Sequence, residues 1–162
     1  MKLSLAVTNT IEKKIRNAKI FQYLESDKTE DIIEVLRLIS VRSGMTIYIW
    51  SSDLGLVNIK SRNTPLPATK SILEALKYAN KNHYFAVYVF PANNNKDLLE
   101  IKSTLPSSSR YLKVNNNTRF LFLVNENANF NYLSSYAEKI HLVNKHTKKY
   151  KLRDSKWILS ND

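Results

Sequence analysis

Short runs rich in β-branched and aromatic residues alternate along this chain with longer runs of helical periodicity, and this alternation constrains the fold most strongly. Strand-like runs occur at residues 19–24, 45–50, 84–90, 119–124 and 139–143. Strands that alternate with helices favour right-handed crossovers and a mostly parallel sheet covered on both faces. The sequence therefore predicts a three-layer α/β sandwich with a RecA- or Rossmann-like sheet of about five strands.

The helices are predicted between these strands: one that begins after Asp27 or Thr29 and is closed by Arg42 and Gly44, and others at residues 68–79, 95–104 and 132–138. Asp27 or Thr29 is positioned to cap the first helix, and Gly44 is expected to end it with a positive φ. Pro91 is expected to stop the third strand, and the third helix is expected to end before Pro106. A further run, residues 156–159, is predicted to add an edge strand, and the residues between 51 and 63 are expected to form a polar loop.

The chain has 162 residues, of which 43% are hydrophobic, so it is long and apolar enough for one domain with a real core. We expect a single α/β domain over residues 1–162, flanked by basic segments at residues 1–16 and 144–162. No stretch approaches the length of a membrane span, and the first apolar run is too short for a signal peptide. These features predict a soluble, cytoplasmic protein.

The sequence lacks the residues that most familiar catalytic chemistries require. The only glycines are Gly44 and Gly55, so no glycine-rich phosphate loop or nucleophile elbow can be written, and the chain has no cysteine. His141 and His146 are five residues apart, a spacing that aligns metal ligands on neither a helix nor a strand. We therefore expect no catalytic residues, no cofactor and no metal.

The charge pattern favours a polyanionic partner. The net charge is +11, and residues 1–19 and 136–162 contribute +4 each. The C-terminal segment also interleaves basic and aromatic side chains, as phosphate attraction and base stacking require. The candidate nucleic-acid residues are Lys148, Lys149, Tyr150, Lys151, Arg153 and Trp157. A solvated basic face that keeps the protein soluble is the alternative interpretation.

The segment Ser51–Asp53 follows the second predicted strand, at the end where α/β sheets usually bind ligands. We therefore consider Trp50 and Asp53 candidate interaction residues for a protein partner. We favour the alternative interpretation that Trp50 is a core side chain, in which case its substitution should lower stability and that of Asp53 should have little effect.

Several short motifs occur together in a recognisable order. They are Asn17–Phe21, Ile47–Leu56 with its Trp-Ser and Gly-Leu pairs, Pro67-Ala68 and Ala86–Phe90. This order resembles the N-terminal, non-catalytic domain of large AAA-type ATPases of the plastid and cyanobacterial kind, over residues 17–143. The resemblance implies a degenerate RecA-like domain that has lost nucleotide chemistry and serves in interaction or regulation. It transfers no catalytic residue.

Three functions remain open after these observations. The first is a non-enzymatic interaction or regulatory module with a degenerate nucleotide-binding-type fold. The second is a nucleic-acid-binding protein that uses the basic N- and C-terminal segments. The third is an enzyme with a dispersed site. Fold class does not decide among them.

Overall fold

The computed structural model describes residues 4–17, 19–61, 64–108, 116–126, 133–142, 150–153 and 156–159. Its centre is a six-stranded sheet with the order β3-β2-β4-β5-β1-β6. The strands are β1 (Phe21–Glu25), β2 (Thr46–Ser51), β3 (Gly55–Asn58), β4 (Ala86–Ala92), β5 (Thr118–Val124) and β6 (Glu138–Lys139). Every pairing in the sheet is parallel except the one between β2 and β3. The predicted α/β class is confirmed, but the sheet has six strands instead of about five.

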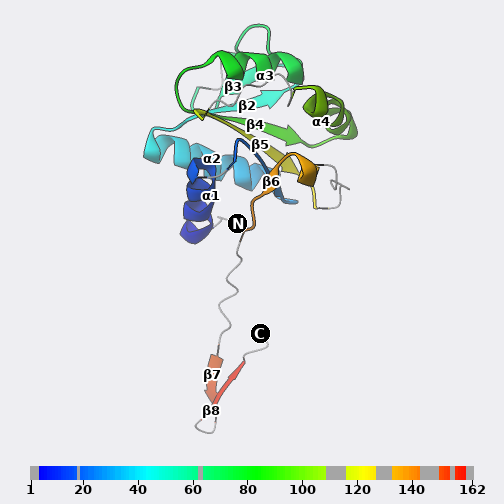
Figure 1. Ribbon diagram of the computed structural model, residues 1–162. Coiled ribbons are helices and arrows are strands. Elements are labelled where there is room, and N and C mark those ends of the chain that lie inside the picture. The colour runs from blue at the N-terminus through cyan, green and yellow to red at the C-terminus, as the bar shows by residue number, and fades with distance from the viewer. Residues whose placement is uncertain are drawn as a thin grey trace.

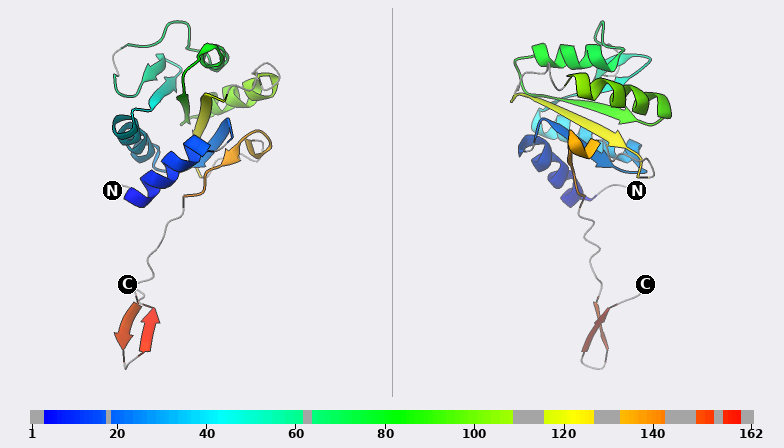
Figure 2. Two further views of the ribbon diagram at one scale, coloured as in Figure 1. Left: turned by 60° about the vertical axis from the view of Figure 1, so that its left-hand side comes forward. Right: turned by 45° about the vertical axis from the view of Figure 1, so that its right-hand side comes forward.

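Helices cover both faces of this sheet (Figure 1). Helices α1 (Leu5–Asn17) and α2 (Thr29–Ser43) lie on one face, and α3 (Ile72–Lys81) and α4 (Asn95–Ser108) lie on the other. Successive strand residues divide between the two faces, so that Val87 and Val89 pack toward α1 and α2 while Tyr88 and Phe90 pack toward α3 and α4. The result is a three-layer sandwich with one apolar cluster on each side of the sheet (Figure 2).

Residues 5–17, which we had placed almost entirely in a basic flanking segment, form α1 and contribute to the core. Val7, Ile11 and Ile15 are buried against α2 and the sheet. Their spacing of four residues places them on one stripe of the helix. The polar run Thr8-Asn9-Thr10 lies between these apolar positions and hid the periodicity.

The ends of α2 and α3 follow from their local sequences. Gly44 ends α2 with a φ of 71°, as the sequence predicted. The third helix begins at Ile72, four residues later than the predicted start at Ala68. Ser71 and Glu74 form a capping box there, in which the Ser71 hydroxyl accepts from the Glu74 N–H and the Glu74 carboxylate accepts from the Ser71 N–H.

Two prolines do not end their elements, so those expectations were wrong. Strand β4 continues through Pro91, which pairs with Leu123 of β5. The pairing of β2 with β4 ends at Val89, so the strand on the other side requires no backbone donor from Pro91. Helix α4 continues through Pro106 to Ser108, where only the last turn loses a backbone hydrogen bond.

Four other elements differ from the sequence prediction. Part of the expected polar loop forms β3, which turns back on β2 through Gly55. The short helix predicted at residues 132–138 is a 3-10 turn, η1 (Leu133–Ser135), and the following strand β6 has only two residues. Residues 156–159 do form a strand, but not at the edge of the main sheet. They form β8 (Lys156–Leu159), which pairs with β7 (Tyr150–Arg153) in a separate two-stranded sheet.

Candidate functional site

A crevice of about 510 Å³ opens at the carboxyl ends of β1 and β5. Helix α2, which follows β1, packs on one face of the sheet, whereas Ala137, which lies after β5 in the sequence, belongs to the apolar cluster of the other face. Neighbouring strands whose connections diverge in this way leave a gap between them, and α/β proteins commonly bind ligands there. The crevice is therefore the first candidate site from topology alone.

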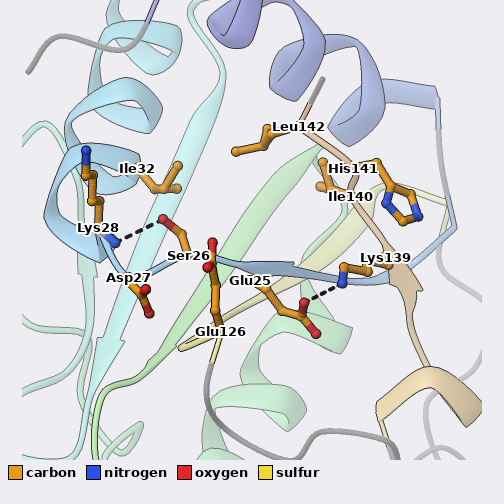
Figure 3. A pocket seen from close by; sticks show the side chains of 10 residues that line it. All are labelled: Glu25, Ser26, Asp27, Lys28, Ile32, Glu126, Lys139, Ile140, His141 and Leu142. Atoms are coloured by element: carbon orange, nitrogen blue, oxygen red, sulfur yellow. Dashed lines mark hydrogen bonds and ion pairs between the residues drawn. The ribbon is translucent and has the colours of Figure 1, made fainter. Parts of the chain in front are cut away.

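Three carboxylates and two lysines line this crevice. It is lined by Glu25, Ser26, Asp27, Lys28, Ile32, Glu126, Lys139, Ile140, His141 and Leu142 (Figure 3). The Lys139 ammonium donates a hydrogen bond to Glu25, and this bond raises the pKa of Lys139. The side chains of Asp27 and Glu126 are exposed, and Lys28 extends away from them (Figure 3).

The loop between β1 and α2 has the position of a phosphate loop but not its chemistry. A phosphate loop wraps backbone N–H groups around the anion and needs glycine for close approach. Here the connection is the short run Ser26-Asp27-Lys28, and the Lys28 N–H is already bound to the Ser26 Oγ at 3.0 Å. Glu25 is ion-paired with Lys139, whereas the exposed carboxylates of Asp27 and Glu126 would repel phosphate oxygens.

The predicted interaction residues Trp50 and Asp53 lie outside this crevice, and only Trp50 is buried. Trp50 is only 1% exposed, and its Nε1 donates to the Thr69 carbonyl at 3.1 Å. Asp53 is exposed in the turn between β2 and β3. The structure therefore places Trp50 in the core and leaves Asp53 accessible to a partner.

The predicted nucleic-acid residues are only partly within the described part of the chain. Lys148 and Lys149 lie outside the described residues. Tyr150, Lys151 and Arg153 belong to β7, and Trp157 belongs to β8. The register of this hairpin pairs Leu152 with Trp157 and Arg153 with Lys156.

A second candidate surface is an apolar groove between α1 and α2, with a volume of about 420 Å³. Three large aliphatic side chains line it and remain exposed: Leu5 at 68%, Leu38 at 56% and Val41 at 67%. Arg42 of α2 fixes the two helices to each other, because its guanidinium bonds to Glu12 and to the Asn9 Oδ1 of α1. We call this surface, formed by Leu5, Thr8, Leu38, Val41 and Arg42, the α1–α2 groove.

The sequence pattern did not indicate either the crevice or the groove. The crevice depends on β1 lying next to β5, although these strands are about a hundred residues apart in sequence. The groove depends on α1, which was not predicted as a helix. The available signal for the groove was that Leu38 and Val41 are apolar but lie outside the buried stripe of the amphipathic helix α2.

No group of three or more histidine, aspartate and glutamate side chains in the described ranges is arranged to hold a metal ion. Among the same residues, no helix has the length and apolar content needed to cross a bilayer. No family model matches the chain, and neither a curated protein nor a solved structure matches it.

Proposed function

We propose that this protein is a non-enzymatic interaction module built on a degenerate, RecA-like version of a nucleotide-binding-type fold. The mostly parallel sheet, with helices on both faces and a short loop from β1 into α2, supports this fold. The glycine-free loop and the carboxylates beside it support the loss of nucleotide binding.

The α1–α2 groove is the observation that carries the proposal. Leu5, Leu38 and Val41 expose most of their side-chain surface in one concave site, which costs free energy until a partner covers it. A groove between two helices accepts the apolar side of a third helix, with side chains at helical spacing as anchors. The partner is therefore an amphipathic helix of another protein.

The test uses a double variant of the groove with a matched control. Leu38→Ser with Val41→Ser removes two exposed anchors of α2, and Leu73→Ser with Leu99→Ser removes two exposed leucines from the opposite face of the molecule. Tagged wild type and both variants are used to capture partners from native lysate, with and without nuclease treatment, followed by quantitative mass spectrometry.

We expect wild type and the Leu73/Leu99 variant to retain the same proteins after nuclease treatment, and the groove variant to lose them. Retention of those proteins by the groove variant would contradict the proposal. Sedimentation velocity of the purified protein provides a second criterion. If wild type forms a dimer at higher concentration and the groove variant does not, the occupant of the groove is a second copy of this chain and not a helix of another protein.

The loss of nucleotide chemistry has its own test. Isothermal titration with Mg-ATP and Mg-GTP is expected to give no saturable heat, because the β1–α2 loop cannot surround a phosphate with backbone donors. Saturable binding at micromolar concentration would contradict this part of the proposal and leave the groove unaffected.

A further inference from the structure

A second cavity, also of about 510 Å³, lies between the C-terminal half of α1 and the start of β6. It is lined by Thr10, Lys13, Lys14, Asn17, Lys19 and Glu138. Lys19 precedes β1, so the cavity is near the amino end of that strand, whereas the crevice described above is at its carboxyl end. The two sites are therefore separate.

The charges of this cavity are unbalanced. Lys13, Lys14 and Lys19 are exposed, and Glu138 is the one carboxylate among the lining residues. Within the described residues, none of the three lysines forms an ion pair, whereas both arginines near Glu12 are paired with it. Three ammonium groups at one concave surface attract a ligand that carries several negative charges.

The helix that carries Lys13 and Lys14 is held firmly at its C-terminal end. The Gln22 Nε2 donates to the Lys14 carbonyl at 3.1 Å, and the Arg119 Nε donates to the Ile15 carbonyl at 3.2 Å. Carbonyls at a helix C-terminus carry partial negative charge, which would oppose an anion nearby. Gln22 and Arg119 already donate hydrogen bonds to these carbonyls. The carbonyls therefore repel an anion that approaches the lysines less strongly.

The described residues that follow β6 pack beside α1. Ile140 and Leu142, which follow β6, pack in the apolar cluster that contains Val7, Ile11 and Ile15 of α1. The segment that leads to the basic residues 145–156 therefore begins beside the basic helix.

We propose that Lys13, Lys14 and Lys19 form a binding site for the phosphate backbone of a nucleic acid. Lysines act as mobile point charges and bind phosphates without reading sequence. The site is therefore expected to bind single-stranded DNA and RNA with little sequence preference. This proposal uses a different surface from the α1–α2 groove and does not depend on it.

Fluorescence anisotropy with a labelled 30-nucleotide single-stranded DNA and the same RNA sequence tests the proposal at several salt concentrations. The site variant is Lys13→Gln/Lys14→Gln/Lys19→Gln. The control variant, Lys70→Gln/Lys77→Gln/Lys81→Gln, removes the same charge from exposed positions of α3 and the residues before it. Thermal melting establishes that both variants fold.

The site variant is expected to bind about tenfold or more weakly at ~50 mM salt, with a logarithmic salt slope smaller by about 2, since each single-strand phosphate contact contributes about 0.7. The control variant should keep most of the affinity and slope. Equal losses in both variants would show a general charge effect and overturn the proposal. So would an absence of binding by wild type, or wild-type binding to anionic phospholipid vesicles without binding to either nucleic acid.

Discussion

The guanidinium of Arg119 on β5 caps the C-terminus of α1, with its Nε 3.2 Å from the carbonyl oxygen of Ile15. Its Nη2 also bonds to the Arg16 carbonyl, and its Nη1 bonds to the carbonyls of Asn116 and Thr118. The same guanidinium lies 5.4 Å from the centre of the Phe85 ring. One side chain in the sheet therefore satisfies the end of a helix that is more than a hundred residues away in sequence.

Replacement of Arg119 with Met should release this end of α1. The last carbonyls of the helix would lose charge-assisted hydrogen bonds, so we expect the free energy of unfolding to fall by about 1.5–3 kcal/mol. Urea denaturation measures the loss, and hydrogen exchange at residues 10–17 should accelerate. Arg37→Met is the control, because Arg37 pairs with Glu34 at the surface of α2 and its loss should cost about 0.5 kcal/mol. Equal costs for both variants would contradict the capping role.

The order of the elements was predictable from the sequence, whereas contacts like this one were not. Apolar runs such as Phe120–Val124 identify buried strands wherever they pack, and Gly44 marks the end of α2 by local geometry alone. Nothing in the local sequence distinguishes Arg119 from other basic residues, because its capping role depends on the contact between β5 and α1. The predicted stop at Pro91 was wrong because the cost of a proline depends on the neighbouring strand, which the local sequence does not contain.

Gly55 should tolerate no side chain, in contrast to Gly44. Both have positive φ, of 81° and 71°, but a Cβ on Gly55 would lie 2.4 Å from the Thr69 Oγ1, whereas one on Gly44 would meet nothing within 4 Å. We expect Gly44→Ala to cost about 1–2 kcal/mol from backbone strain, and Gly55→Ala about 2–5 kcal/mol because overpacking adds to that strain. Denaturation midpoints of the two variants measure the difference. Equal midpoints would show that Thr69 can move aside.

The candidate site was less predictable than the fold. Residues 51–53 were favoured because they follow a strand, but the crevice forms where β1 and β5 are neighbours, and strand order cannot be read from local patterns. The excess of positive charge at both ends was evident in the sequence. The packing of Ile140 and Leu142 beside α1 was not evident in it.

Trp50 and Asp53 should respond very differently to substitution. Trp50→Ala would empty a buried site between β2 and α3, and we expect it to cost about 3–5 kcal/mol of unfolding free energy. Trp50→Phe keeps an aromatic ring in the core but removes the indole N–H, so that the Thr69 carbonyl loses its donor. This loss should cost about 1–3 kcal/mol. Asp53→Ala, at an exposed turn, should stay within about 0.5 kcal/mol of wild type. Thermal and urea denaturation would refute this order if Asp53→Ala proved as damaging as Trp50→Phe.

Two carboxyl groups should give the stability of the protein opposite dependences on pH. Hydrogen bonds from Arg42 lower the pKa of Glu12, so its stabilising effect is present at neutral pH and is lost as the pH falls through that lowered value. Glu12→Gln is expected to lower stability at pH 7 and to reduce the acid sensitivity of the protein. Urea denaturation between pH 3 and 7 measures this change. A variant with wild-type stability at pH 7 would show that the contacts with Arg16 and Arg42 contribute nothing.

Asp97 should act in the other direction. It is 7% exposed in the first turn of α4, its Oδ1 has no hydrogen-bond partner in the described structure, and burial raises its pKa. Since the folded state holds the proton more tightly than the unfolded state, this carboxyl destabilises the fold at neutral pH and is relieved as the pH falls through its raised pKa. Asp97→Asn removes the buried charge and keeps the shape of the side chain. We therefore expect the variant to be more stable than wild type at pH 7, with the difference shrinking toward pH 4, as measured by urea denaturation across this range. A difference that stays constant with pH would show that the effect of Asp97 does not come from its charge.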